Sequence, residues 1–170
     1  MSRFNEFRQI VKKYAEAYFE FEEFQKQEET TFIPQKGDQK TGVIGEAYIY
    51  EYLSKSSNCK LKFGNHSEKG WDIKSSKYKY QVKTVSEYSR TKIISPIHDG
   101  WDFLYFVHLN KRFEPDKIYK IKNPGNLNDK VIRGLRFPNE EKQTIIINKN
   151  SCILYDETNE FMRIMNIKVT

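Results

Sequence analysis

The chain has few cysteines and no long apolar segment, and both absences limit what it can be. Its two cysteines, Cys59 and Cys152, lie far apart and show no C-x-x-C or other spacing typical of a metal site. We expect them to be free thiols, as is usual in a reducing compartment. No segment has the apolar length needed to span a bilayer, and the N-terminal segment lacks the apolar core of a signal peptide. A cytoplasmic protein with no membrane partner is therefore expected.

Internal repeats, low-complexity segments and helicase or ATPase motifs are also absent from the sequence. The 170 residues suit a single domain, residues 1–170, with a sizeable core. Aromatic residues make up 15% of the chain and charged residues 31%, which is a globular composition. The formal net charge of +6 and the isoelectric point near 9.1 favour an acidic partner, with nucleic acid ahead of an anionic membrane.

Hydrophobic periodicity predicts a long helix at the start of the chain. Residues 3–28 carry apolar side chains at steps of three or four, namely Phe4, Phe7, Ile10, Val11, Tyr14, Tyr18 and Phe21. This stripe indicates a core-facing helix within residues 1–29, although part of it could instead form a dimer interface. Residues 30–40 should then form a loop, which Pro34 and Gly37 mark.

A second helix is expected to begin near Asp38 or Thr41, either of which could cap it, and to end at about Ser54. Two glycines three residues apart allow another backbone to come close to its first turn. Glu46 follows the second of these glycines directly.

The remaining segments are typical of short strands. Strands are expected at residues 59–64, 70–74, 78–85, 101–109, 116–122 and 143–149. The segment 101–109 is almost entirely apolar, as expected of a strand buried on both faces. A turn at residues 123–125 should precede a short helix, and a C-terminal helix should begin near Asp156 or Thr158. This order of elements predicts an α/β or α+β domain with a central mixed sheet.

The segment from Gly70 to Ser86 alternates polar and apolar residues, as two strands with different faces would. The apolar face is expected to hold Trp71, Ile73, Tyr78, Tyr80 and Val82. The polar face is expected to hold Asp72, Lys74, Lys79, Gln81 and Lys83. Antiparallel pairing that keeps the apolar residues together puts Asp72 opposite Gln81, with Lys83 diagonal to this pair. A slip of one residue would bury the Asp72 charge without a partner, which is unfavourable.

This polar cluster suits metal-assisted hydrolysis of a phosphodiester. A hard cation such as Mg²⁺ prefers oxygen ligands, and Asp72, the Gln81 amide and the Val82 backbone carbonyl could supply three. The ion would polarise the phosphate and acidify a water molecule. Lys83 would stabilise the developing charge and orient or activate that water. The alternative is an ordinary solvent-exposed strand face on which opposite charges pair.

The stretch "WDIK…YKYQVKT" resembles the active-site hairpin of the PD-(D/E)xK nuclease superfamily. Asp72, Gln81 and Lys83 match its acidic, second acidic and lysine positions, and Glu46 matches a glutamate that many members carry on the preceding helix. The sequence departs from the pattern at Trp71, where proline is usual, and at Gln81, where an acid is usual, although some similar nucleases carry glutamine.

This resemblance covers roughly residues 41–110 and implies both a fold and a reaction. The fold would be an α/β restriction-endonuclease-like core, a central mixed β-sheet flanked by helices, with the long N-terminal helix added. The nuclease core would occupy residues 41–122, with further strand and helix elements at 123–170. The activity would be that of a DNA endonuclease that depends on Mg²⁺, with Mn²⁺ as a substitute.

Basic and hydroxyl side chains around the hairpin are candidates for contacts with double-stranded DNA. These residues are Lys74, Lys79, Ser86, Tyr88, Ser89, Arg90, Lys92 and His98. Residues 86–100 could equally form a solvated surface loop. A weaker set of candidates for reading bases consists of Asn126, Asn128, Lys130, Arg133 and Arg136.

Within the nuclease class, the small single domain favours a type II restriction endonuclease of a restriction–modification system. A homodimer would present two active sites to a short palindromic site, with the N-terminal helix at the dimer contact. Two alternatives remain. One is a junction-resolving, repair or homing nuclease of the same fold, and the other is a non-catalytic DNA-binding protein with a decayed nuclease site.

Overall fold

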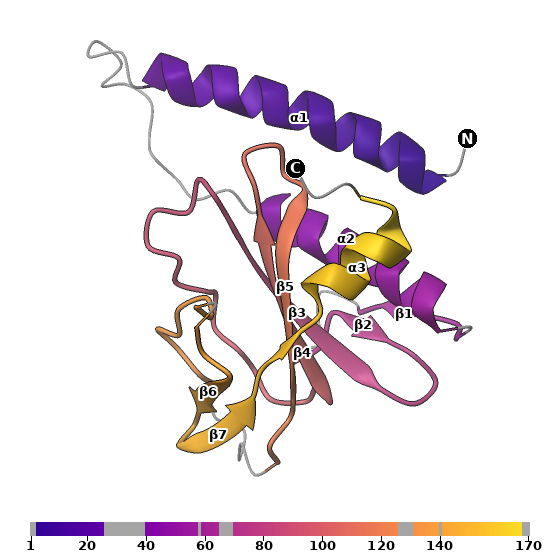
Figure 1. Cartoon of the computed structure of the whole chain (residues 1–170), viewed down its shortest axis with the longest axis vertical. Coiled ribbons are helices and arrows are strands. Elements are labelled where there is room, and N and C mark those ends of the chain that lie inside the picture. The colour runs from indigo at the N-terminus through magenta and orange to yellow at the C-terminus, as the bar shows by residue number, and fades with distance from the viewer. Residues whose placement is uncertain are drawn as a thin grey trace.

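The computed structural model describes residues 3–25, 40–57, 59–64, 70–125, 131–139 and 141–167. Its helices in these ranges are α1 (Arg3–Gln25), α2 (Lys40–Ser56) and α3 (Thr158–Met165). Its strands are β1 (Lys62–Phe63), β2 (Ile73–Lys74), β3 (Lys79–Ser86), β4 (Phe103–Leu109), β5 (Pro115–Lys122), β6 (Thr144–Ile147), β7 (Asn150–Ile153) and β8 (Tyr155–Asp156). Figure 1 shows these elements around one central sheet.

The central sheet has six strands in the order β1-β2-β3-β4-β5-β8. Strands β3 and β4 are parallel, and every other neighbouring pair in this sheet is antiparallel. Parallel neighbours require a crossover connection, and residues 87–102 supply it without forming a helix. The protein is therefore an α/β domain with a mixed central sheet, as the sequence predicts.

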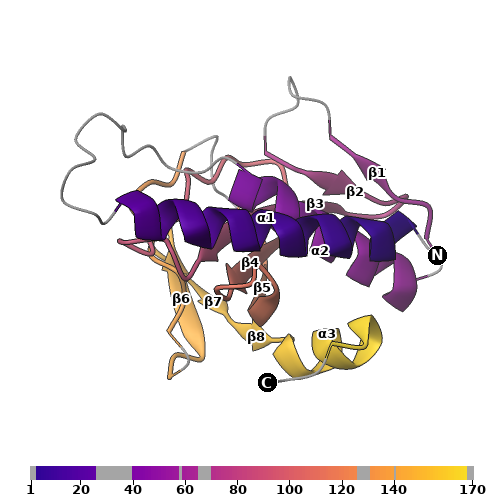
Figure 2. The ribbon, with the colours of Figure 1, turned by 90° about the horizontal axis from the view of Figure 1, so that it is seen from above.

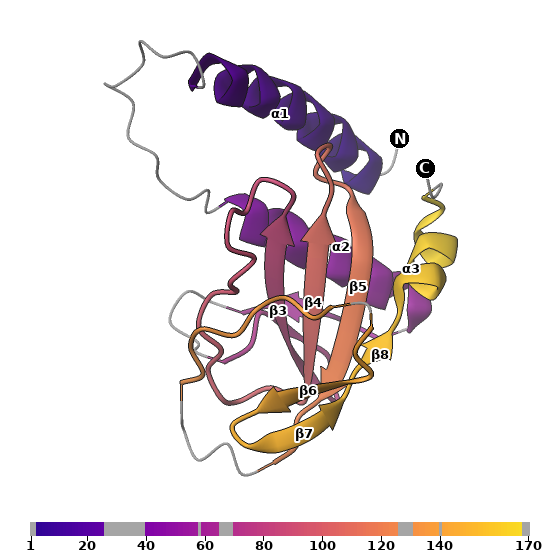
Figure 3. The same cartoon turned by 60° about the vertical axis from the view of Figure 1, so that its left-hand side comes forward.

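Strand β4 lies in the middle of the fold and is buried along almost its whole length. Its side chains alternate between two cores, because successive residues of a strand point to opposite faces. Tyr105 and Val107 pack with α2 and α3, whereas Leu104 and Phe106 pack with the crossover and with β6–β7. Figure 3 shows α2 behind the sheet and the β6–β7 hairpin in front of it.

Helix α1 packs along one end of the molecule, above α2 and the β4–β5 turn (Figure 2). Most of the predicted stripe faces the core, but Ile10 is 59% exposed, so its predicted core position is wrong. Ala15 is buried instead. At 3.6 residues per turn, Ile10 lies about 100° around the helix from the buried Val11, on the side away from Ala15, so it falls at the edge of the buried stripe. The side chain of Phe21 lies outside the described residues.

Several predicted boundaries differ from the structure. Strand β2 begins at Ile73 rather than near residue 70, and β7 and β8 were not predicted. The short helix expected after residue 125 is wrong for residues 131–139, which are extended and form isolated bridges with residues 93 and 97. These bridges supply hydrogen bonds that a helix would otherwise have to make internally. The predicted Pro34–Gly37 loop, the Asp38 cap and the segment 126–130, with Asn126, Asn128 and Lys130, lie outside the described residues.

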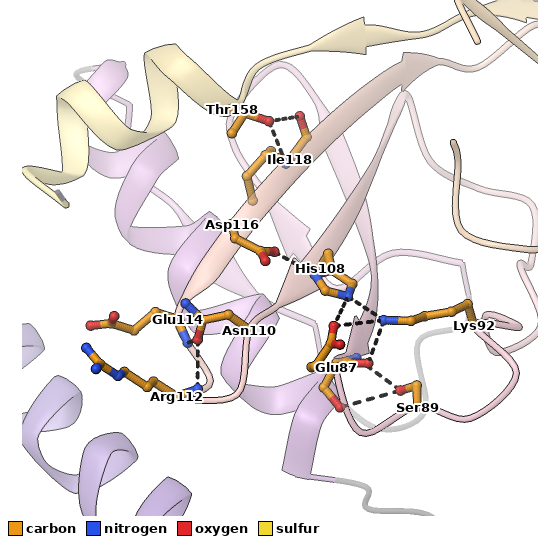
Figure 4. A network of polar contacts seen from close by, with 11 residues as sticks. Glu87, Ser89, Lys92, His108, Asn110, Arg112, Glu114, Asp116, Ile118 and Thr158 are labelled. Atoms are coloured by element: carbon orange, nitrogen blue, oxygen red, sulfur yellow. Dashed lines mark hydrogen bonds and ion pairs between the residues drawn. The ribbon is translucent and has the colours of Figure 1, made fainter. Parts of the chain in front are cut away.

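The C-terminal helix is confirmed as α3, but its N-cap is Glu157, which makes no side-chain capping bond, and not the predicted Asp156 or Thr158. Contacts of these two residues nevertheless hold the start of the helix. Asp156 Oδ1 accepts a hydrogen bond from the Thr158 N–H at 2.9 Å. Thr158 Oγ1 accepts one from the Ile118 N–H at 3.0 Å, which ties α3 to β5 (Figure 4). Both cysteines are free, as predicted, with Cys152 buried. Among the described helices, none is both long enough and apolar enough to cross a membrane.

Candidate active site

The β2–β3 pairing has the register that the alternation of side chains predicts. Ile73 lies opposite Tyr80, and Lys74 lies opposite Lys79. The regular pairing ends at Ile73: the Asp72 N–H donates to the carbonyl of Tyr80, which already lies opposite Ile73, so the ladder is irregular at Asp72. The predicted register is therefore confirmed for these two pairs, and the expected Asp72–Gln81 pair is not part of the regular ladder. The predicted place of Trp71 on the apolar face with Ile73 is wrong: its ring centroid lies 6.0 Å from Lys74 Nζ, and it belongs to neither apolar core.

Asp72 is held at the end of the β2–β3 ladder by its side chain and its backbone. Its N–H donates to the Tyr80 carbonyl at 2.8 Å, and its carbonyl accepts from the Gly64 N–H at 2.8 Å. Its carboxylate Oδ2 accepts a hydrogen bond from the Val82 N–H at 2.7 Å. The side chain thus replaces a backbone acceptor, which explains why the regular strand starts only at Ile73.

The Asp72 bond also fixes the direction of the Val82 carbonyl. In an antiparallel ladder, the N–H and the carbonyl of one residue point towards the same neighbouring strand. The Val82 carbonyl therefore points to the side on which Asp72 lies, at the position where regular pairing with β2 has ended. It is available there as an oxygen ligand.

Glu46, Asp72 and Lys83 come from three different segments and share one electrostatic environment. The pKa of Glu46 is raised from 4.5 to about 7, mainly by burial and also by the Asp72 charge, while the Lys83 charge opposes the shift. Burial also raises the pKa of Asp72, against the lowering effects of the Val82 hydrogen bond and of Lys83. Burial lowers the pKa of Lys83, which Asp72 and Glu46 partly offset. Two carboxylates therefore face a single ammonium group, an arrangement that favours an additional cation.

Gln81 supplies a buried oxygen that has no partner. Its side chain is 3% exposed, and its Oε1 atom makes no hydrogen bond within the described part of the chain. An unpaired buried acceptor costs about 1–3 kcal/mol and calls for an explanation, such as an ion or a water molecule. Thr84 Oγ1 and the Trp101 indole nitrogen are also buried without partners, but Gln81 is the residue next to Val82, whose N–H binds the Asp72 carboxylate.

The donor set at this position fits a hard divalent cation. Carboxylate, amide and backbone carbonyl oxygens are the ligands that Mg²⁺ accepts. Among the described residues, no three His, Cys, Asp or Glu side chains form a group that could hold a metal ion. The proposed ligands would not form such a group, because Gln81 stands where a third acid would be, and only Asp72 and Glu46 are acidic.

Glu46 reaches this region because α2 packs very closely on β3. Gly45 lies against Thr84, and a side chain at position 45 would collide with it. The sequence predicts the close approach of another backbone, and at Gly45 the close neighbour is instead the Thr84 side chain. No close approach is found at Gly42, where a β-carbon would meet nothing within 4 Å.

Several residues that were predicted to contact DNA instead form hydrogen bonds or stack within the protein. Ser86 is 3% exposed, and its N–H donates to Ser89 Oγ at 3.0 Å. Tyr88 stacks on Phe113, and its hydroxyl donates to the Lys111 carbonyl at 3.1 Å. Other predicted contacts lie nearer the surface: Arg90 is exposed, and Lys74, Lys79 and His98 are half-buried.

Lys92 belongs to a network that the sequence did not predict (Figure 4). Its ammonium group lies 2.6 Å from His108 Nε2, 3.3 Å from the Ser86 carbonyl and 3.4 Å from a Glu87 carboxylate oxygen. His108 Nδ1 lies 2.6 Å from Asp116 Oδ1. An ammonium can only donate, so His108 accepts at Nε2 and donates from Nδ1 to Asp116. The sequence offered one signal for this network, namely His108 as the polar residue within the apolar strand β4.

No family model matches this chain, and no curated protein matches it either. The functional interpretation therefore depends on the geometry of the β2–β3 hairpin and α2, and on the resemblance of the hairpin sequence to known nucleases.

Proposed function

We propose that the protein is a metal-dependent DNA endonuclease with a restriction-endonuclease-like core. The observation that carries this proposal is the partnerless oxygen of Gln81, which is next to Val82, the residue whose N–H binds the Asp72 carboxylate. Lys83 lies on the same strand face as Gln81. The raised pKa of Glu46, to which Asp72 contributes, adds a second acid from α2. Apart from Val82, these residues are those that the resemblance to PD-(D/E)xK nucleases implies.

Asp72, the Gln81 amide oxygen and the Val82 carbonyl would hold the ion, which would be Mg²⁺ with Mn²⁺ as a substitute. When bound, the ion supplies positive charge at the scissile phosphate and makes a water molecule more acidic. The Val82 N–H bond at 2.7 Å holds the Asp72 carboxylate in one orientation, which keeps its other oxygen free for a ligand.

Two side chains of the protein would accept the water proton and stabilise the developing charge. Hydrolysis forms a bond between a water oxygen and phosphorus, breaks the bond to the leaving sugar oxygen, and requires a group that accepts the water proton. Glu46 is suited to accept it, because a carboxylate with a pKa of about 7 is a stronger base than an ordinary one. Lys83 places its ammonium group where negative charge develops on the phosphate.

Within this class we propose a small type II restriction endonuclease that acts as a homodimer on a palindromic site in double-stranded DNA. Helix α1 leaves Ile10 59% exposed, and the side of the helix that carries it is the proposed contact between two copies. A junction-resolving, repair or homing nuclease would use the same site on a different substrate.

Digestion of mixed-sequence plasmid DNA with Mg²⁺ tests the proposal. Discrete fragments are expected, and Asp72→Ala and Lys83→Ala should abolish them while DNA binding survives. Lys111→Ala, at an exposed position of the β4–β5 turn, removes the same charge as Lys83→Ala and should cleave normally. Nicking confined to branched DNA would indicate a junction-resolving enzyme. Salt-sensitive binding without cleavage would indicate a non-catalytic protein, and normal cleavage by Lys83→Ala would overturn the site assignment.

A further inference from the structure

Three lysines form a continuous row across the first three strands of the sheet. Lys62 lies directly opposite Lys74 on β1 and β2, and Lys74 lies directly opposite Lys79 on β2 and β3. Residues that lie directly opposite in an antiparallel pair point to the same face. The three ammonium groups therefore leave the same face of the strands that lie side by side at one edge of the sheet (Figure 2).

This row is unfavourable for the protein alone. Like charges directly opposite each other destabilise a strand pair. Within the described part of the chain, no carboxylate forms an ion pair with any of the three ammonium groups. Two of them contact the Trp71 ring, with Lys62 Nζ 5.8 Å and Lys74 Nζ 6.0 Å from its centroid. Such contacts leave the charges able to bind an external anion.

The row lies directly beside the candidate active site. Lys79, Gln81 and Lys83 alternate along β3, so their side chains leave the same face of the sheet. The row is displaced from Asp72 and Gln81 by two residues, which is about 6.7 Å along a strand. Three strands about 4.8 Å apart give the row a length of about 9.6 Å. Phosphates on one DNA strand follow each other at about 3.4 Å along the helix axis, so the row can serve about two or three of them.

We propose that Lys62, Lys74 and Lys79 bind successive backbone phosphates of the DNA strand whose scissile phosphate lies at Asp72 and Gln81. This inference rests on the proposed function and adds the path of the substrate across β1, β2 and β3. The contacts are with phosphate alone, so they position the strand and carry no information about base sequence. No sequence pattern identified Lys62 as a DNA contact. It belongs to the proposed DNA-binding surface because it lies directly opposite Lys74.

The test compares two triple variants of equal charge. One is Lys62→Gln with Lys74→Gln and Lys79→Gln. The other is Lys111→Gln with Lys142→Gln and Lys149→Gln, at exposed positions of the β4–β5 turn, the segment before β6 and the β6–β7 turn. Each variant binds a labelled mixed-sequence DNA duplex in EDTA over a range of salt concentrations. The slope of log K against log salt should become less negative by about 0.9 per lost phosphate contact in the first variant, and should stay near the wild-type value in the second.

A third variant with arginine at positions 62, 74 and 79 keeps the charges and should retain the wild-type slope. This variant distinguishes the effect of losing the three charges from the effect of a folding defect at these positions. Equal slopes for the two glutamine variants, or a wild-type protein that does not bind the duplex at low salt, would overturn the phosphate row. A row-dependent slope in a protein that never cleaves DNA with Mg²⁺ would support the row and reject the proposed hydrolysis.

Discussion

A β-carbon on Gly45 of α2 would lie 2.0 Å from Oγ1 and 2.9 Å from Cγ2 of Thr84 in β3. A β-branched threonine within a strand has few alternative rotamers, so it cannot easily move aside. Gly45 therefore sets the distance between the helix and the strand that carries Gln81 and Lys83. Because Glu46 is the next residue of the helix, the same contact fixes its distance from the candidate site.

Gly45→Ala is accordingly expected to push α2 away from β3. The free energy of unfolding should fall by about 1–3 kcal/mol, as is usual for overpacking, and DNA cleavage should fall with it. Gly42→Ala, in the same helix, adds its methyl group to open space and should raise stability by up to about 1 kcal/mol. Chemical denaturation of both variants measures the difference. Equal stability of the two would show that the close approach does not control the packing.

Gln81→Met should change stability and metal binding in opposite directions. Methionine has a similar shape but no oxygen, so it removes the buried acceptor that has no partner. The metal-free protein should become more stable by about 1–3 kcal/mol, because the desolvation cost of that oxygen disappears. Stabilisation by added Mg²⁺ and DNA cleavage should both be lost. Thermal unfolding with EDTA and with Mg²⁺ measures both effects.

Gln81→Glu is the matched variant that keeps an oxygen and adds a charge. It should bind the ion more tightly and remain active, because a carboxylate is the more usual ligand for Mg²⁺. Without metal it should be less stable than wild type, since a third carboxylate would then lie near Asp72 and Glu46. A Gln81→Glu protein that neither binds Mg²⁺ nor cleaves would argue against Gln81 as a ligand.

The sequence predicts the hairpin well because local physics determines it. Alternation along β3 and the cost of burying the Asp72 charge permit one register, and the structure has that register. The mixed sheet and the two long helices follow from periodicity in the same way. The pKa of Glu46, by contrast, depends on how deeply the close packing of α2 on β3 buries that side chain, which no local pattern specifies.

The surroundings of the site were harder to predict because they depend on long-range contacts. Ser86, Ser89 and Lys92 have the composition of a DNA-contacting loop, yet their polar groups bond within the protein. His108 is one polar residue in an apolar strand; its partner Asp116 lies on the neighbouring strand β5, and its partner Lys92 lies in the crossover before β4. Strand β8 pairs with β5 across more than thirty residues, and its two-residue length leaves no pattern to recognise.

Lys92 is expected to stabilise the start of the crossover rather than to bind DNA. It has a φ of 51°, in the left-handed region, and its ammonium group contacts both Glu87 and His108. Lys92→Met keeps most of the side-chain volume but leaves His108 Nε2 without its donor, which should cost about 1–3 kcal/mol. Hydrogen exchange at residues 86–100 should accelerate. Lys111→Met, at an exposed turn, should change stability by less than about 0.5 kcal/mol, and an equal effect of both variants would contradict this role.

The raised pKa of Glu46 predicts how stability depends on pH without metal. In the folded protein this carboxyl binds its proton up to about pH 7, whereas the unfolded chain releases it near 4.5. The stability that the protonated form contributes is therefore complete below the lower value and is lost as pH rises through the higher one. Asp72 has a raised pKa of the same sign, so it adds to this slope at the acidic end.

Glu46→Gln should remove most of this dependence, because glutamine does not titrate. In EDTA, the variant should be more stable than wild type at about pH 8 and nearly equal to it at about pH 5. Mg²⁺ favours ionised carboxylates, so it should stabilise the wild type more at the higher pH, by about 2.7 kcal/mol at a concentration one hundred times its dissociation constant. Urea denaturation of both proteins at the two pH values, with and without Mg²⁺, measures the free energy of unfolding under each of these four conditions. A wild-type protein whose stability rises from about pH 5 to about pH 8 in EDTA would contradict the raised pKa, since a buried carboxyl that prefers its proton can only produce the opposite slope.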